Sequence, residues 1–228
     1  MREPARDYRH VRIVTDPNQL VELARNFGRG ARALLGMTGP PGAGKSTLAA
    51  WLIARLAPHA ALFPMDGFHL ANSELTRLGR TGQKGAPRTF DVNGFVAALE
   101  RVRRGDSDVY LPEYRRGDLN EPIAGAILIP VTARIVVVEG NYLLHDSGRW
   151  TAVANMLDEC WYIDAASRVR EERLIERQLS KGRTIEAAKA WATGSDARNA
   201  RLVARSRHRA SKLVPGTLEL SGGDPSSR

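Results

Sequence analysis

The residues best suited to chemistry form one glycine-rich stretch. It consists of Gly39, Pro40, Pro41, Gly42, Ala43, Gly44, Lys45, Ser46 and Thr47. This stretch matches the phosphate-binding pattern G-x-x-x-x-G-K-[ST] at every fixed position. Glycines let successive backbone N–H groups face a phosphate without an intervening Cβ. We expect Lys45 to reach the β- and γ-phosphates of a nucleotide and the Ser46 hydroxyl to hold Mg²⁺.

Two carboxylates each follow an apolar run further along the chain. Asp66 comes after residues 60–65, and Glu139 ends the β-branched run 134–138. In open α/β sheets, chemistry gathers at the carboxyl ends of the strands. Asp66 is therefore placed where a catalytic carboxylate is useful, and Glu139 is a candidate to hold Mg²⁺ directly or through water. The alternative is that each acid only caps the turn after its strand.

Two arginines stand four residues apart in a basic helical segment. Arg173 and Arg177 belong to residues 168–181, and a glycine breaks the helical pattern directly afterwards. Residues four apart lie on one face of a helix. We expect a lid over about residues 170–195, whose arginines close over a triphosphate and neutralise charge during phosphoryl transfer. The alternative is that both arginines pair with neighbouring glutamates in solvent.

Strand and helix patterns alternate along the chain and would position these residues. We expect strands at residues 33–37, 60–65, 109–114, 125–129, 134–138, 159–164 and 217–220. We expect helices at residues 17–28, 48–56, 92–105, 150–157, 168–181, from 185, and 202–213. Asp16, Asp91, Ser167 and Thr184 are the expected helix caps. The pattern predicts a parallel sheet with helices on both faces and the phosphate-binding loop after its first strand.

Length and composition fit one globular domain in the cytoplasm. The chain has 228 residues, of which 43% are hydrophobic and 26% charged. No apolar run approaches the ~20 residues that cross a bilayer, so we expect no membrane partner. The one cysteine, Cys160, cannot form an internal disulfide. We expect the domain to span residues 16–221, with tails at 1–15 and 222–228. A homodimer is compatible with the sequence.

The net charge of +9 raises the alternative of a nucleic-acid partner. Much of the excess lies between residues 168 and 212. Acidic residues are interspersed there, and no ladder of aromatic residues accompanies them. The charge therefore favours a basic lid around an anionic nucleotide over nucleic-acid binding.

Several short motifs, in this order, resemble the phosphoribulokinase/uridine kinase family of P-loop small-molecule kinases. They are the phosphate-binding loop, Met65-Asp66-Gly67-Phe68-His69, Lys84-Gly85-Ala86-Pro87 with Phe90-Asp91, Val138-Glu139-Gly140-Asn141-Tyr142-Leu143-Leu144, and Gly182-Arg183. The resemblance covers roughly residues 20–220 and is strongest to the bacterial branch around pantothenate kinase and fructose transport-system kinases. It implies a P-loop NTPase fold, three-layer α/β/α, with a mostly parallel central sheet and a helical lid.

The resemblance also implies roles for single residues. Asp66 corresponds to the base on the acceptor hydroxyl, Glu139 to the acid of the Walker B strand, and Arg173 and Arg177 to lid residues. The acceptor contacts that it implies are Asp66, His69, Arg88, Tyr114, Glu139 and Tyr142. The chain departs from the family pattern after Tyr114, since Arg115 stands where an acid or a serine is common.

These observations lead to one main hypothesis and two alternatives. The main hypothesis is an ATP·Mg²⁺-dependent kinase that phosphorylates a hydroxyl of a small metabolite, such as a sugar, a nucleoside or pantothenate. One alternative is a regulatory NTP switch, although the chain lacks an Asn-Lys-x-Asp motif for reading guanine. The other is an ATPase linked to nucleic acid through the basic C-terminal region.

Overall fold

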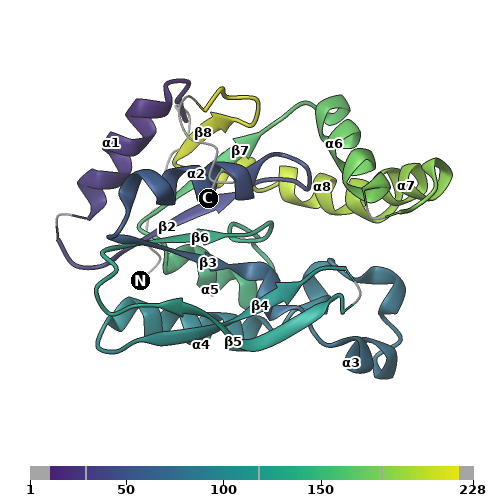
Figure 1. Ribbon diagram of the computed structural model, residues 1–228, viewed down its shortest axis with the longest axis horizontal. Coiled ribbons are helices and arrows are strands. Elements are labelled where there is room, and N and C mark those ends of the chain that lie inside the picture. Colours follow the sequence, from purple (N-terminus) through teal and green to yellow (C-terminus); the bar gives the residue numbers. More distant parts are fainter. Residues whose placement is uncertain (1–10, 29, 118, 181, 221–228) are drawn as a thin grey trace.

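A computed structural model describes residues 11–28, 30–117, 119–180 and 182–220 (Figure 1). Its strands are β1 (Arg12–Ile13), β2 (Ala33–Thr38), β3 (Ala60–Pro64), β4 (Val109–Arg115), β5 (Glu121–Ile129), β6 (Ile135–Glu139), β7 (Glu159–Asp164) and β8 (Lys212–Pro215). Its α-helices are α1 (Pro17–Phe27), α2 (Lys45–Leu56), α3 (Asn72–Arg77), α4 (Val92–Arg104), α5 (Thr151–Asn155), α6 (Ser167–Leu179), α7 (Ile185–Trp191) and α8 (Ala197–Ala204). Within these described residues, no helix is long and apolar enough to cross a bilayer.

A six-stranded sheet forms the centre of the described part, in the order β1-β8-β7-β2-β6-β3. All of its neighbouring strands are parallel. Its central strands are buried on both faces, as expected for a parallel sheet between helices. The register pairs Met37 of β2 and Pro64 of β3 with the same residue of β6, Glu139. The carboxyl ends of β2, β3 and β6 therefore meet at one edge.

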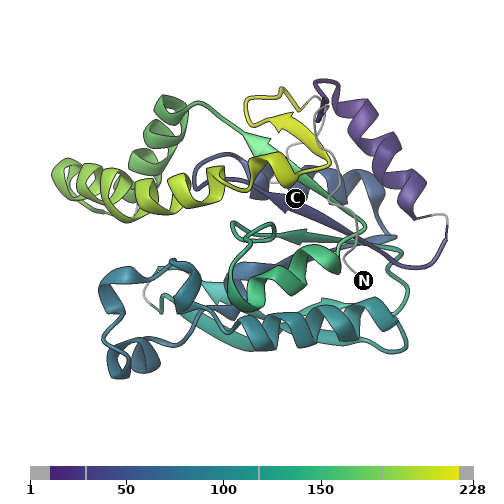
Figure 2. The same cartoon turned by 180° about the vertical axis from the view of Figure 1, so that it is seen from behind.

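Helices cover both faces of this sheet, which confirms the three-layer α/β/α fold (Figures 1 and 2). On one face, α1 and α2 pack against the side chains of Leu35, Met37 and Val137. On the other face, α4 and α5 pack against Leu34 and Val136. The alternation of side chains along each strand places successive residues in the two opposite layers.

Local capping follows the expected signals at three helices. The side chain of Asp16 accepts a hydrogen bond from the backbone N–H of Asn18 at 2.9 Å. Asp91 caps α4 and Thr184 caps α7 in the same manner. The prediction for Ser167 is wrong, since it is the first residue of α6 and the cap position is Ala166.

The antiparallel pair β4–β5 and the helical arm α6–α8 extend beyond the central sheet (Figure 1). The two strands expected at residues 109–114 and 125–129 are confirmed and form this pair, although β5 begins at Glu121, earlier than expected. The arm contains one π-helical turn, Ala192–Asp196, before α8. The short helix α3 was not predicted. The arm and the tip end of the β4–β5 pair reach the side of the sheet where its strands end (Figure 1).

The expected helix over residues 202–213 and the expected strand at 217–220 are wrong. Helix α8 ends at Ala204, and the following strand β8 pairs with β7 on one side and β1 on the other. Pro215 cannot continue a helix, and burial of Leu213 and Val214 in the sheet favours a strand. Strand β1 lies in the segment expected as a tail, so the phosphate-binding loop follows the second strand. The expected tail residues 1–10 and 222–228 lie outside the described residues.

Candidate active site

The phosphate-binding loop connects β2 to α2, which begins at Lys45. Gly42 and Gly44 have φ angles of 78° and 96°, in the left-handed region that favours glycine. The start of α2 presents free backbone N–H groups and the positive end of the helix dipole to the space above the loop. The loop therefore has the backbone geometry that binds a phosphate.

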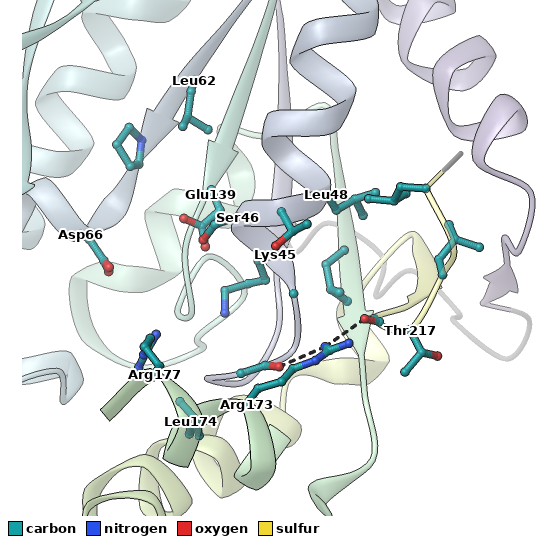
Figure 3. Close-up of a pocket in the computed structure, with 18 of the residues that line it drawn as sticks. Lys45, Ser46, Leu48, Leu62, Asp66, Glu139, Arg173, Leu174, Arg177 and Thr217 are labelled. Atoms are coloured by element: carbon teal, nitrogen blue, oxygen red, sulfur yellow. Dashed lines mark hydrogen bonds between the residues drawn. The ribbon is translucent and has the colours of Figure 1, made fainter. Parts of the chain in front are cut away.

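Lys45 and Glu139 both line this space (Figure 3). Lys45 is buried, and its Nζ donates to the carbonyl oxygen of Pro40 at 3.1 Å. Burial lowers the pKa of Lys45, while the carboxylates of Glu139 and Asp66 act in the opposite direction. Burial raises the pKa of Glu139 to about 6, against the effects of Lys45 and of a hydrogen bond with Ser46. Phosphate oxygens would give Lys45 a strong ionic partner in this poorly solvated place.

Ser46 and Glu139 fit the requirements of Mg²⁺ in a nucleotide site. No group of three or more His, Cys, Asp or Glu side chains that could hold a metal ion occurs in the described ranges. Mg²⁺ at a nucleotide commonly takes one or two protein oxygens and completes its octahedron with phosphate and water. A hydroxyl next to a carboxylate at the phosphate-binding loop meets that description.

Asp66 lies in a single 3₁₀ turn, Met65–Phe68, directly after β3. A side chain at Gly67 would collide with the carbonyl oxygen of Pro112, so a glycine lets this turn pack closely against β4. Asp66 points into the same space as Lys45 and Arg177 (Figure 3). The structure thus brings the carboxylate toward the phosphate-binding loop, at the sheet edge where the sequence predicted it.

Arg116 is a site residue that sequence reasoning missed. Its Nη2 donates to Oδ2 of Asp66 at 2.6 Å from the tip of the β4–β5 hairpin. The signal was the basic pair Arg115 and Arg116, where the family pattern has an acid or a serine. Arg115 instead pairs with Glu113, at 2.7 Å. Only the fold of the hairpin shows which of the two arginines reaches the site.

These groups line one cavity of about 860 Å³. Its walls come from the phosphate-binding loop and α2, the β4–β5 hairpin, α6, and residues 215–220 after β8. Tyr114, Arg116 and Ile127 line it from the hairpin, and Arg173 and Arg177 line it from α6. The cavity therefore lies between the two extensions of the sheet.

The two predicted lid arginines have different partners. Nη1 of Arg173 donates to the carbonyl oxygens of Gly216, at 3.0 Å, and Gly42, at 3.3 Å. The guanidinium of Arg177 makes no hydrogen bond or ion pair with any described residue. Desolvation and the nearby Arg116 lower the pKa of Arg177, while Asp196 and Asp66 oppose this shift. Arg173 joins α6 to the loop, whereas Arg177 lines the cavity.

We expect hydrogen exchange across α6 and α7 to slow when a non-hydrolysable ATP analogue and Mg²⁺ are added. Closure of Arg177 onto phosphate would restrain this arm, because lids belong to the least stable parts of a fold. Mass spectrometry of exchanged peptides measures the effect, with α4 as an internal reference. Protection confined to the phosphate-binding loop would contradict a lid.

Three predicted acceptor residues lie away from the cavity wall. His69 stacks between Phe90 and Tyr114, with ring centroids 4.0 and 4.6 Å away, and its Nδ1 lies 2.7 Å from the carbonyl oxygen of Asp66. The hydroxyl of Tyr142 donates to the carbonyl oxygen of Gly85 at 2.6 Å. Arg88 is exposed, and neither it nor Tyr142 lines the cavity. Of the predicted aromatic and basic acceptor residues, the structure brings only Tyr114 to the cavity.

We expect His69 to make the fold less stable as the pH falls below the ordinary histidine value of 6.5. Burial lowers the pKa of His69, so the unfolded chain takes up the proton first and unfolding is favoured. Urea unfolding at pH 7.5 and 5.5 measures the loss, which His69→Gln should reduce. His208→Gln, at an exposed histidine, is the matched control. Equal pH dependence in both variants would contradict this role for His69.

Comparisons with known proteins place the chain among kinases. No family model matches it. The "uncharacterized protein YggC" of Escherichia coli is 36% identical over 193 residues, which cover 82% of this chain and 79% of that protein. The "putative uridine kinase C227.14" of Schizosaccharomyces pombe is 30% identical over 175 residues, which cover 72% and 73%. The chain belongs to the phosphoribulokinase/uridine kinase family.

A solved structure supports the same assignment. The crystal structure of a "putative fructose transport system kinase" from Silicibacter sp. TM1040 superposes with a TM-score of 0.81 at 35% identity. The match covers 88% of this chain and 99% of that one. The chain is therefore a P-loop kinase, a transferase that binds nucleotide.

Proposed function

We propose that the chain transfers the γ-phosphate of ATP to a hydroxyl group of a small metabolite. The observation that carries this proposal is the placement of Asp66 across one cavity from Lys45, Ser46 and Glu139. A nucleotide switch needs the last three residues but no base facing the phosphate. The kinases among the relatives support a phosphotransferase, and a sugar, a nucleoside and pantothenate are the acceptors to test first.

The residues of the cavity have different roles in phosphoryl transfer. Asp66 accepts a hydrogen bond from the attacking hydroxyl and takes its proton, which later passes to water. The acceptor oxygen forms a bond to the γ-phosphorus as the bond to the β–γ bridging oxygen breaks, and ADP leaves. Lys45 and Arg177 stabilise charge on the transferred group. Mg²⁺, held by Ser46 and Glu139, would neutralise further charge on the phosphates.

A panel of hydroxyl-bearing metabolites tests the proposal. Purified protein is incubated with ATP and Mg²⁺, ADP release is followed, and mass spectrometry identifies any phosphorylated product. We expect at least one acceptor to accelerate ADP release and to gain one phosphate. If only a nucleic acid or a partner protein stimulates hydrolysis, and no acceptor gains phosphate, the proposal is wrong.

A further inference from the structure

We propose that the hydroxyl acceptor carries an anionic group, a carboxylate or a phosphate ester, and that Arg116 binds this group. The inference rests on the kinase function proposed for the cavity and goes on to define the class of acceptor. Arg116 lines the cavity from the hairpin tip, on the same side as Asp66 and Tyr114. Its side chain is 48% exposed, so a ligand in the cavity can reach it.

The ion pair between Arg116 and Asp66 conflicts with the role of Asp66 as a base. Oδ2 of Asp66 accepts a charge-assisted hydrogen bond at 2.6 Å. An oxygen that already accepts this bond is less available to accept a second one from the attacking hydroxyl. An acceptor with its own anionic group offers Arg116 a replacement partner and releases this oxygen. A neutral acceptor leaves the pair in place.

The charges on this side of the cavity also favour an anionic acceptor. Arg116 lies close enough to Arg177 to lower the pKa of Arg177, while Asp196 and Asp66 oppose this shift, and Asp66 also forms the ion pair with Arg116. Glu113 also lines the cavity, but it pairs with Arg115 at 2.7 Å. Arg177 comes from the lid and is suited to the transferred phosphate. A second anion, on the acceptor, would match the guanidinium of Arg116.

Tyr114 holds Arg116 in this position. Its hydroxyl donates to the carbonyl oxygen of Asn120 at 2.8 Å, which joins the two strands across the hairpin tip. The guanidinium carbon of Arg116 lies 5.9 Å from the centre of the Tyr114 ring, and Nζ of Lys84 lies 5.2 Å from it. Lys84 therefore adds a second positive charge next to Tyr114. The positive charges of Lys84 and Arg116 thus both lie next to Tyr114, on the side of the cavity where Asp66 stands.

Matched pairs of acceptors test the inference. In each pair a neutral hydroxymethyl or hydroxyl group replaces the anionic group: D-glycerate and glycerol, pantothenate and panthenol, fructose 6-phosphate and fructose. Calorimetry measures the binding of each compound to the protein loaded with a non-hydrolysable ATP analogue and Mg²⁺. Product formation with ATP is measured separately. The first two pairs test a carboxylate, and the third tests a phosphate ester.

Arg116→Gln and Arg115→Gln are compared with the unchanged protein. We expect anionic members to bind and react better than their neutral partners. Arg116→Gln should reduce kcat/KM for the anionic member by about 10- to 100-fold, the range for a hydrogen bond between charged groups. Arg115→Gln makes the same change one residue away, at a side chain paired with Glu113, and should keep the preference.

Four results would separate the alternatives. The inference is overturned if neutral members bind as well as anionic ones, or if none of the anionic members binds. It is also overturned if Arg116→Gln weakens ATP binding and leaves the preference unchanged, because Arg116 would then serve the nucleotide. Binding of an anionic compound that depends on Arg116, without any phosphate transfer, would support the subsite and contradict the proposed kinase function instead.

Discussion

Asp66→Asn is expected to lower the rate of phosphate transfer by about 10²–10⁴-fold, the usual contribution of a general base. The substitution keeps the shape of the side chain and removes its negative charge. Nucleotide affinity should change little, because we expect the contacts to phosphate to come from the loop, Lys45 and Arg177, which line the cavity with Asp66. Transfer kinetics with the acceptor identified in the panel, together with ATP binding by calorimetry, measure both effects on one preparation.

Asp164→Asn is the matched control for this experiment. Asp164 also ends a strand of the central sheet, and it also pairs with an arginine, Arg207, at 2.9 Å. It does not line the cavity, so its substitution should leave the rate of transfer nearly unchanged. If a well-folded Asp66→Asn protein transfers phosphate at a normal rate, Asp66 is not the base. A loss of thermal stability with normal specific activity would show that it only caps the turn.

Lys45→Ala is expected to weaken ATP binding and to reduce turnover by about 10²–10³-fold, as when one donor to a transition-state anion is removed. Lys45 is buried with Nζ on a backbone carbonyl oxygen, so the fold does not depend on an ion pair at this side chain. The midpoint of thermal unfolding without nucleotide should therefore stay close to that of the unchanged protein.

ATP and Mg²⁺ should raise this midpoint in the unchanged protein, because a ligand stabilises the state that it binds. A smaller rise in a variant measures its loss of nucleotide binding. Lys45→Met keeps most of the side-chain volume and separates the effect of charge from that of a cavity. Both variants should lose most of the rise. Wild-type turnover by either one would show that the phosphate-binding loop is assigned wrongly.

The features that were predictable from sequence are those set by neighbours along the chain. Glycine spacing determines the phosphate-binding loop, and a buried β-branched strand places Glu139 at its end. Asp66 was found because strand ends in a parallel sheet meet at one edge. These predictions needed no knowledge of which strands are adjacent.

The features that were missed depend on contacts between distant segments. Strand β8 has four residues, too few for a periodic pattern, and it exists because β1 and β7 flank it. Arg116 reaches Asp66 only because Gly67 allows the turn after β3 to pack against Pro112. The hydroxyl of Tyr142 donates a hydrogen bond to the carbonyl oxygen of Gly85, and no local sequence pattern indicates this contact. Tertiary packing decides such cases.

The position of β8 bears on how the enzyme is made. Among the described strands, β8 is the last in sequence, yet it lies inside the sheet between β1 and β7. Gly216, directly after it, packs against Ala43 of the phosphate-binding loop and accepts the hydrogen bond from Arg173. A nascent chain on the ribosome can form β2, β6 and β7 before this strand emerges. The nucleotide site is therefore completed only after Gly216 has been synthesised, because its contacts with Ala43 and Arg173 cannot form before then.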